Sequence, residues 1–148
     1  MWVSTKAQYG MRALIEVALG GDSPTSLKVV AERQGLSHLY LEQIFATLRK
    51  AGYVESVRGA HGGYKVAKPA DQITALEIVE LLEGSLAPVT CIEDSDNCGR
   101  AGNCAAEPLW RQVDAAVRGV LGGTTLAALM AERELLNLEP LPAQFAAA

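Results

Sequence analysis

This sequence of 148 residues is short of aromatic side chains and contains no long apolar run. Only six residues are Phe or Tyr although 49% of the chain is apolar, so the core must be aliphatic and rich in alanine. The longest apolar runs are far shorter than the roughly 20 residues that a membrane-spanning helix requires. The N-terminal residues also lack the apolar core of a signal peptide. We therefore expect a cytoplasmic protein of one domain, with or without an oligomerisation arm, and no membrane partner.

The residue patterns of common enzymes are also missing. No Cys-x-x-Cys pair or cofactor fingerprint is present, and both histidines, His38 and His61, lie in the first half of the chain. Cys91, Cys98 and Cys104 are an odd number of cysteines, which a disulfide framework does not explain. The sequence therefore argues against an enzyme. A thiol-dependent redox protein built on the three cysteines is the alternative.

Positive charge is scarce overall, which at first argues against nucleic acid as a partner. The net charge of −4 is, however, unevenly distributed. Residues 1–70 contain nine Lys or Arg and five acids, a net charge of +4, whereas residues 71–148 contain four Lys or Arg and twelve acids, a net charge of −8. A basic N-terminal half is what a surface that neutralises DNA phosphates would need.

The segment of residues 37–50 has the pattern of an amphipathic helix. Its apolar residues recur at helical spacing and form one stripe: Leu41, Ile44, Phe45 and Leu48. Ser37 can cap this helix, and a short helix over residues 27–34 with a turn at Gly35 precedes it. The face opposite the stripe and its edges carry Leu39, Glu42, Gln43, Ala46, Arg49 and Lys50. Polar and basic groups beside a small residue suit the DNA major groove. An ordinary surface helix is the alternative.

Two short strands, residues 53–57 and 64–67, are predicted directly after this helix. The segment between them contains three glycines, which permit positive φ and close approach to a partner backbone. Arg58, His61 and Lys65 flank this tip, and Arg58 is positioned to reach the minor groove or a phosphate. The pattern predicts a winged helix-turn-helix, with a plain hairpin as the alternative.

The second half is predicted to contain helices separated by a cysteine-containing loop. Thr74 and Glu77 form a capping-box pattern at the start of a helix that ends near Glu83. After Pro108, apolar residues repeat at intervals of three and four, like a packing seam, and Thr124 is expected to cap a further helix over residues 126–136. The seam has no obvious partner in the winged domain, so we expect a homodimer that binds a palindromic operator. The alternative is that the helix folds back on its own domain.

The predicted fold class is therefore mainly α with a small β-hairpin. The winged helix-turn-helix domain covers residues 1–84, the cysteine-containing loop residues 85–106, the dimerisation helices residues 107–136 and a C-terminal tail residues 137–148.

Three segments together resemble the winged-helix transcriptional regulators typified by IscR, NsrR and CymR: STKAQYGMRAL, SHLYLEQIFATLRKAGYVESVRGAHGGY and ITALEIVELLEG. The resemblance runs from residue 4 to about residue 121. It implies a dimeric repressor or activator with DNA contacts at the positions of Leu39, Tyr40, Glu42, Gln43 and, in the wing, Arg58. We add His38, in the same first turn, as a candidate.

Many members of that family bind an iron–sulfur cluster through three cysteines in the loop before the dimerisation helix, which implies the same for Cys91, Cys98 and Cys104. Thiolates bind iron well, and a polar loop can wrap around a cluster. The first gap here is six residues where the IscR-type pattern has five, and Glu107 stands in place of a histidine. Either a 2Fe–2S or a 4Fe–4S cluster is compatible. The candidate fourth ligands are Glu107, Gln8, and Asp94 or Asp96; zinc is the alternative metal.

We therefore expect a sequence-specific DNA-binding regulator, acting as a repressor, whose DNA affinity is controlled by an iron–sulfur cluster that senses iron, redox state or nitric oxide. A winged-helix module that binds proteins rather than DNA is the remaining alternative, and salt dependence separates the two.

Overall fold

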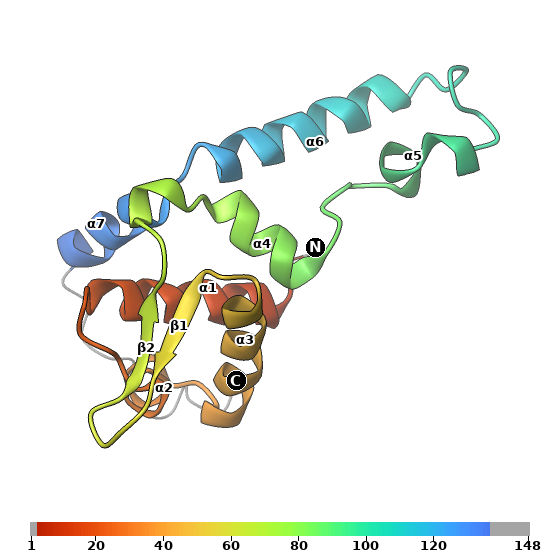
Figure 1. Cartoon of the computed structure of the whole chain (residues 1–148). Coiled ribbons are helices and arrows are strands. Elements are labelled where there is room, and N and C mark those ends of the chain that lie inside the picture. Colours follow the sequence, from red (N-terminus) through yellow and green to blue (C-terminus); the bar gives the residue numbers. More distant parts are fainter. Residues whose placement is uncertain (1–2, 137–148) are drawn as a thin grey trace.

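Seven α-helices, two short 3-10 helices and one β-hairpin form the part of the chain that the computed structural model describes, residues 3–136 (Figure 1). This arrangement confirms the predicted fold class. The predicted tail, residues 137–148, lies outside the described residues. The elements in chain order are α1 (Thr5–Leu19), α2 (Leu27–Gln34), α3 (His38–Lys50), β1 (Val54–Val57), β2 (Gly63–Val66), η1 (Ala70–Gln72), α4 (Ala75–Glu83), α5 (Thr90–Glu93), η2 (Ser95–Asn97), α6 (Glu107–Gly122) and α7 (Leu126–Leu136).

The apolar stripe of α3 is buried against α1, α2 and β1, as its spacing predicts. All four of its residues are fully buried: Leu41, Ile44, Phe45 and Leu48. The ring of Phe45 meets the ring of Tyr64 edge-on, with 5.2 Å between the ring centroids, so α3 and β2 share one core. Ser37 caps the helix, because its Oγ accepts a hydrogen bond from the backbone N–H of Tyr40 at 3.2 Å. The opposite face of α3 is consequently left toward solvent.

The hairpin is fixed to the helical domain through the segment before α2. β1 and β2 are antiparallel, with Val54 opposite Val66 and Val57 opposite Gly63. Thr25 extends the pairing: it exchanges two backbone hydrogen bonds with Tyr64, of 2.8 and 2.9 Å. Gly63 is required here, because a Cβ at this position would lie 2.3 Å from the carbonyl oxygen of Thr25. The hairpin therefore has a set position relative to α2 and α3.

The N-caps of α4 and α7 agree only in part with the caps predicted from the sequence. Thr74 and Glu77 form the predicted capping box of α4. Thr124 does not cap α7; its hydroxyl donates to the carbonyl of Val120, and Thr125 accepts a hydrogen bond from the backbone N–H of Ala128 at 3.1 Å. The prediction failed because two adjacent threonines are equally good caps, and the β-bridge between Thr74 and Thr125 selects the second.

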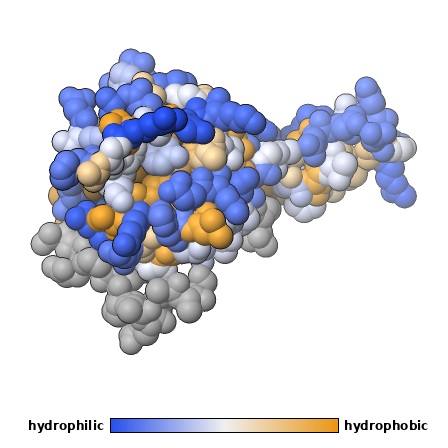
Figure 2. All heavy atoms as spheres, turned by 60° about the horizontal axis from the view of Figure 1, so that its bottom comes forward, coloured by the Kyte–Doolittle hydropathy of each residue, from blue (hydrophilic) through white to orange (hydrophobic). Residues whose placement is uncertain are grey.

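Helix α6 forms an arm that extends from the body to the cysteine-containing segment (Figures 1 and 2). No residue of α6 is buried, and the helix packs on α4. Residues 85–106 are not wholly a loop, because they contain α5 and η2. Helix α7, which the sequence analysis groups with the dimerisation helices, packs on α1 of its own chain and buries Leu126 in the winged-domain core. None of the described helices is long and apolar enough to cross a membrane.

The capping box of α4 makes the stability of the fold dependent on pH. Hydrogen bonds from the backbone N–H and then the hydroxyl of Thr74 lower the pKa of Glu77 below its ordinary value. The ionised carboxylate therefore stabilises the fold at neutral pH, and this contribution is lost as the pH falls through the lowered pKa.

We predict that Thr74→Ala lowers the free energy of unfolding by about 1 kcal/mol at neutral pH, because an N-cap is lost. Glu77→Gln should also lower the free energy of unfolding at neutral pH. Its free energy of unfolding should equal that of the unmodified protein at a pH low enough to protonate Glu77 in both the folded and the unfolded state. Urea unfolding at neutral and acidic pH measures both effects. Thr124→Ala is the matched control and should change stability less, because Thr124 caps no helix.

Candidate nucleic-acid interface and cysteine segment

The face of α3 opposite the core is open to solvent and carries the residues that are predicted to contact DNA bases. Leu39 is 72% exposed, and Glu42 and Gln43 are also exposed. His38 is exposed as well, and its Nε2 lies 3.1 Å from Glu42 Oε1 one turn later. On such a face, the apolar side chain can contact a thymine methyl, and the polar side chains beside it can form hydrogen bonds with base edges.

Tyr40 is placed differently from its neighbours. It is half-buried, its ring meets that of Tyr9 edge-on at a centroid distance of 6.2 Å, and its hydroxyl lies 3.5 Å from Thr5 Oγ1. These contacts direct the side chain toward α1. Tyr40 therefore helps to fix α3 on α1, a role that helical spacing alone did not indicate.

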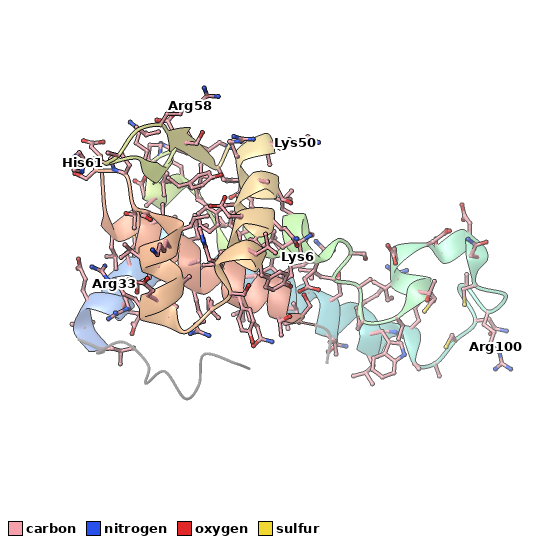
Figure 3. The ribbon with its side chains drawn as sticks, turned by 90° about the horizontal axis from the view of Figure 1, so that it is seen from below. Lys6, Arg33, Lys50, Arg58, His61 and Arg100 are labelled. Carbon is pink, nitrogen blue, oxygen red and sulfur yellow. The ribbon has the colours of Figure 1, made fainter. Side chains whose placement is uncertain are left out.

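Basic side chains surround the exposed face of α3. Arg49 and Lys50 are exposed at its C-terminal end, and Arg58 and His61 are exposed in the hairpin. Figure 3 shows Lys50 and Arg58 toward the same edge of this face, while Arg100 lies far away at the end of the arm.

Two further features of the hairpin bear on its use as a wing. Lys65 is only half exposed, and its Nζ lies 3.0 Å from Glu55 Oε1 on the opposite strand, so part of its charge is already neutralised. Gly62 shapes the tip, because a Cβ there would lie 2.1 Å from the carbonyl oxygen of Val57. Arg58 and His61 are therefore better placed than Lys65 to contact an anionic partner.

Several charged residues on this half of the molecule belong to none of the motifs that the sequence contains. Lys6 and Arg33 are seen on opposite sides of α3 in Figure 3. Only the total charge of the N-terminal half signalled them, because neither belongs to a recognisable motif. Glu16 and Arg133, discussed below, were also missed; a glutamate on the apolar side of α1 was the available signal.

The three cysteines all lie in the segment between α4 and α6. Cys91 is in α5, Cys98 follows η2 and Cys104 precedes α6; all three are half-buried free thiols. Desolvation, followed by the charges of Cys98 and Cys104, raises the pKa of the Cys91 thiol, so the other two sulfurs are near enough to influence it. Within residues 3–136, however, no three His, Cys, Asp or Glu side chains are gathered closely enough to hold a metal ion. Three thiols are chemically suitable ligands for an iron–sulfur cluster, but their sulfur atoms would have to move closer together to bind one.

The candidate fourth ligands are held in different ways. Glu107 Oε1 accepts hydrogen bonds from Arg111 Nε at 2.8 Å and Nη2 at 2.6 Å, and Glu107 Oε2 accepts one from the backbone N–H of Gly102. The Arg111 side chain is the main cause of the lowered pKa of Glu107, and the backbone N–H of Gly102 adds to it, so both contacts favour the ionised carboxylate. Gln8 lies on α1, where its side chain donates to the carbonyl of Val3. Asp94 caps η2, and the neighbouring Asp96 is exposed.

An apolar groove lies along the inner side of the arm. It has a volume of about 390 Å³ and is lined by Val3, Val79, Ala116, Val117, Val120 and Leu121. Val120 is 70% exposed, and Leu109 at the other end of α6 is 53% exposed. Asp114 on the same helix has a buried Oδ1 with no hydrogen-bond partner among the described residues. The predicted apolar seam of α6 is thus present, and residues 3–136 leave much of it uncovered.

Comparisons with known proteins agree with this geometry. The family model Rrf2, described as an iron-dependent transcriptional regulator, matches residues 3–132. The chain is 40% identical over 136 residues to the protein rrf2 of Nitratidesulfovibrio vulgaris, covering 91% of both proteins. It is 44% identical over 127 residues to the HTH-type transcriptional regulator CymR of Bacillus subtilis, covering 85% of this chain and 87% of CymR.

Solved structures have the same fold. The structure of B. subtilis CymR, described as the global cysteine regulator, has a TM-score of 0.76 at 43% identity and covers 89% of this chain and 98% of CymR. T. potens IscR has a TM-score of 0.72 at 40% identity and covers 93% of this chain and 92% of that protein. CymR and IscR are transcriptional regulators, which confirms the prediction that the chain is not an enzyme. From residue 3 to residue 132, in sequence and in fold, this chain belongs to the Rrf2 family of transcriptional regulators.

Proposed function

We propose that this DNA-binding regulator acts as a cytoplasmic repressor and binds a palindromic operator as a homodimer. The observation that carries the proposal is the exposed polar face of α3 beside a hairpin with Arg58 and His61 at its tip. The face of α3 would enter the major groove, with His38, Leu39, Glu42 and Gln43 toward base edges and Arg49 and Lys50 toward phosphates. Tyr40 would contribute mainly by holding α3 on α1.

The apolar groove supports the homodimer. A helix with no buried residue and with exposed Leu109 and Val120 has unsatisfied apolar surface, which a second α6 would cover. A two-fold dimer would present two copies of α3 to successive turns of the major groove, which is the reason for a palindromic operator.

Val120→Glu is predicted to convert the dimer to a monomer, because it places a charge in the apolar groove. Sedimentation equilibrium measures the mass directly. The matched control is Ala115→Glu, which introduces the same charge on the exposed side of α6 away from the groove and should leave the dimer intact. A dimer that tolerates Val120→Glu would contradict the proposed interface.

We further propose that Cys91, Cys98 and Cys104 hold an iron–sulfur cluster, 2Fe–2S or 4Fe–4S. When bound, the cluster would supply a redox-active and removable group that ties the segment together. Deprotonation of the three thiols would provide the ligands. Glu107 is our first choice for the fourth ligand because it stands where the IscR-type pattern has a histidine, although it would have to leave Arg111. Gln8 of a second subunit is the second choice, and Asp94 or Asp96 is the third.

A series of contacts connects the cysteine-containing segment to α3, the proposed recognition helix, and supports the proposed control of DNA affinity. Helix α5 packs against α6, and Arg118 of α6 forms an ion pair with Glu80 of α4. Three residues later, at the C-terminal end of α4, Glu83 Oε1 accepts hydrogen bonds from the backbone N–H and hydroxyl of Ser4, which precedes α1. A rearrangement of the cysteine segment could therefore shift α4 and α1, on which α3 rests.

A second candidate function is regulation through thiol chemistry or zinc, without an iron–sulfur cluster. The free thiols and the likeness to CymR, described as a cysteine regulator, favour it over a third candidate, a module that binds only protein.

The deciding experiment is an anaerobic purification followed by an absorbance spectrum and iron and sulfide counts. DNA-shift assays with and without the chromophore then follow, at several salt concentrations. We expect stoichiometric iron and sulfide and a DNA affinity that changes when they are lost and falls with added salt. Bound zinc would favour the second candidate, and absence of any salt-dependent DNA binding would favour the third.

A further inference from the structure

A buried carboxylate lies where α1, the end of α2 and α7 meet. The side chain of Glu16 is only 7% exposed. Its Oε1 accepts hydrogen bonds from Arg133 Nε at 2.7 Å and from Gln34 Nε2 at 3.0 Å. A charge removed from water is costly unless it is paired and hydrogen-bonded, so these two contacts keep Glu16 in place. Arg133 is 117 residues away in the sequence, which makes this a tertiary contact between α1 of the winged domain and α7.

The same cluster holds the end of α2. Gln34 is the last residue of α2, and its side-chain oxygen accepts from Arg12 Nε at 3.2 Å. Its backbone carbonyl, one of those left unpaired at a helix end, accepts from Arg12 Nη2 at 2.8 Å. Gly35 follows with a φ of 65°, and α3 begins at His38. These side-chain contacts therefore fix the turn between α2 and α3, the proposed recognition helix.

Arg133 lies on the face of α7 that packs against α1, and this places it next to Glu16. Leu126 is buried in the winged-domain core and Met130 packs against that core. Arg133 follows at the next helical turn, so the three side chains share the side of α7 that faces α1. Because α7 directly follows α6, the arm is connected to the turn between α2 and α3 through Arg133.

We propose that Arg133 is a positioning residue for DNA recognition: through Glu16 and Gln34 it holds the end of α2 and so sets the orientation of α3 on the duplex. The inference rests on the proposed DNA binding. Arg133 itself does not touch DNA. Recognition by α3 requires its polar groups to meet base edges within hydrogen-bond distance, so a small shift of the turn weakens binding to a specific sequence.

Two variants with opposite changes of charge test the proposal. Arg133→Ala removes a positive charge, and Glu16→Gln removes a negative one. The probe is a duplex selected from a random-sequence pool by the unmodified protein, and its dissociation constant is measured at one fixed salt concentration. A purely long-range charge effect would weaken binding in the first variant and strengthen it in the second. Positioning predicts that both bind about tenfold more weakly, a change of about 1.4 kcal/mol.

Three controls separate positioning from general loss of stability. Arg133→Lys keeps the charge and should recover part of the affinity, and Glu132→Ala, exposed on the same helix, should bind normally. Hydrogen exchange should become faster at the Leu36 amide, which is bonded to the carbonyl of Ala31, in Arg133→Ala. Exchange at the Gly84 amide, bonded to Glu80 in α4, should not change.

Unchanged affinity in both charge variants, or changes in opposite directions, would overturn the inference while leaving DNA binding intact. If the unmodified protein selects no duplex, the proposed DNA binding itself fails, and the role of Arg133 in recognition fails with it. Faster exchange at Leu36 would in that case still show that Arg133 holds the turn.

Discussion

The Cys98→Ala variant, purified without oxygen, is expected to contain no iron and no sulfide and to show no visible absorbance. The reason is chemical: three thiolates hold the proposed cluster, and removal of one leaves too few protein ligands for stable binding. The effect is a complete loss rather than a graded one. Metal analysis and an absorbance spectrum measure it directly.

The fold of the winged domain should survive this change. Cys98 lies in the segment beyond α4, outside the residues that form the hydrophobic core. Thermal unfolding of Cys98→Ala should therefore match that of the unmodified protein prepared without metal. Ser95→Ala, in the same segment, is the matched control and should retain iron and sulfide. A Cys98→Ala protein that retained both in full would show that Cys98 is not a ligand.

The Arg58→Ala variant is expected to bind a selected duplex about tenfold more weakly than the unmodified protein, as the loss of a good arginine contact to DNA implies. Arg58 follows β1 and is exposed in the hairpin beside the open face of α3. If it contacts a phosphate, the slope of log affinity against log salt should also decrease by about one. Fluorescence anisotropy at four or five salt concentrations provides both quantities.

Arg100→Ala is the matched control for the wing. It removes the same charge from an exposed position, but Figure 3 shows Arg100 at the far end of the arm. Both proteins should be compared without metal, so that the proposed cluster does not enter the result. Equal losses of affinity would mean that only net charge matters, and a normal affinity for Arg58→Ala would remove the wing from the proposed interface.

Local signals in the sequence were sufficient for much of the fold. The spacing of Leu41, Ile44 and Phe45 predicted which side of α3 is buried, because helical geometry places residues three and four apart on one face. The capping box at Thr74 and Glu77 was also predictable, since both partners lie within one turn. The candidate DNA contacts and the cysteine ligands stay predictions.

Other features depended on contacts that no local pattern reveals. The sequence alone determined the helical pattern, the hairpin, the separation of charge between the two halves and the placing of three thiols in one segment, because each depends on residues close together in the chain. Only the tertiary structure decided that Tyr40 packs on α1, that Thr125 rather than Thr124 caps α7, and that Arg133 reaches Glu16. These outcomes depend on which surfaces meet after folding. The position of Glu16 on the apolar side of α1 indicates that it needs a partner, but no periodicity or spacing identifies Arg133, 117 residues away, as that partner.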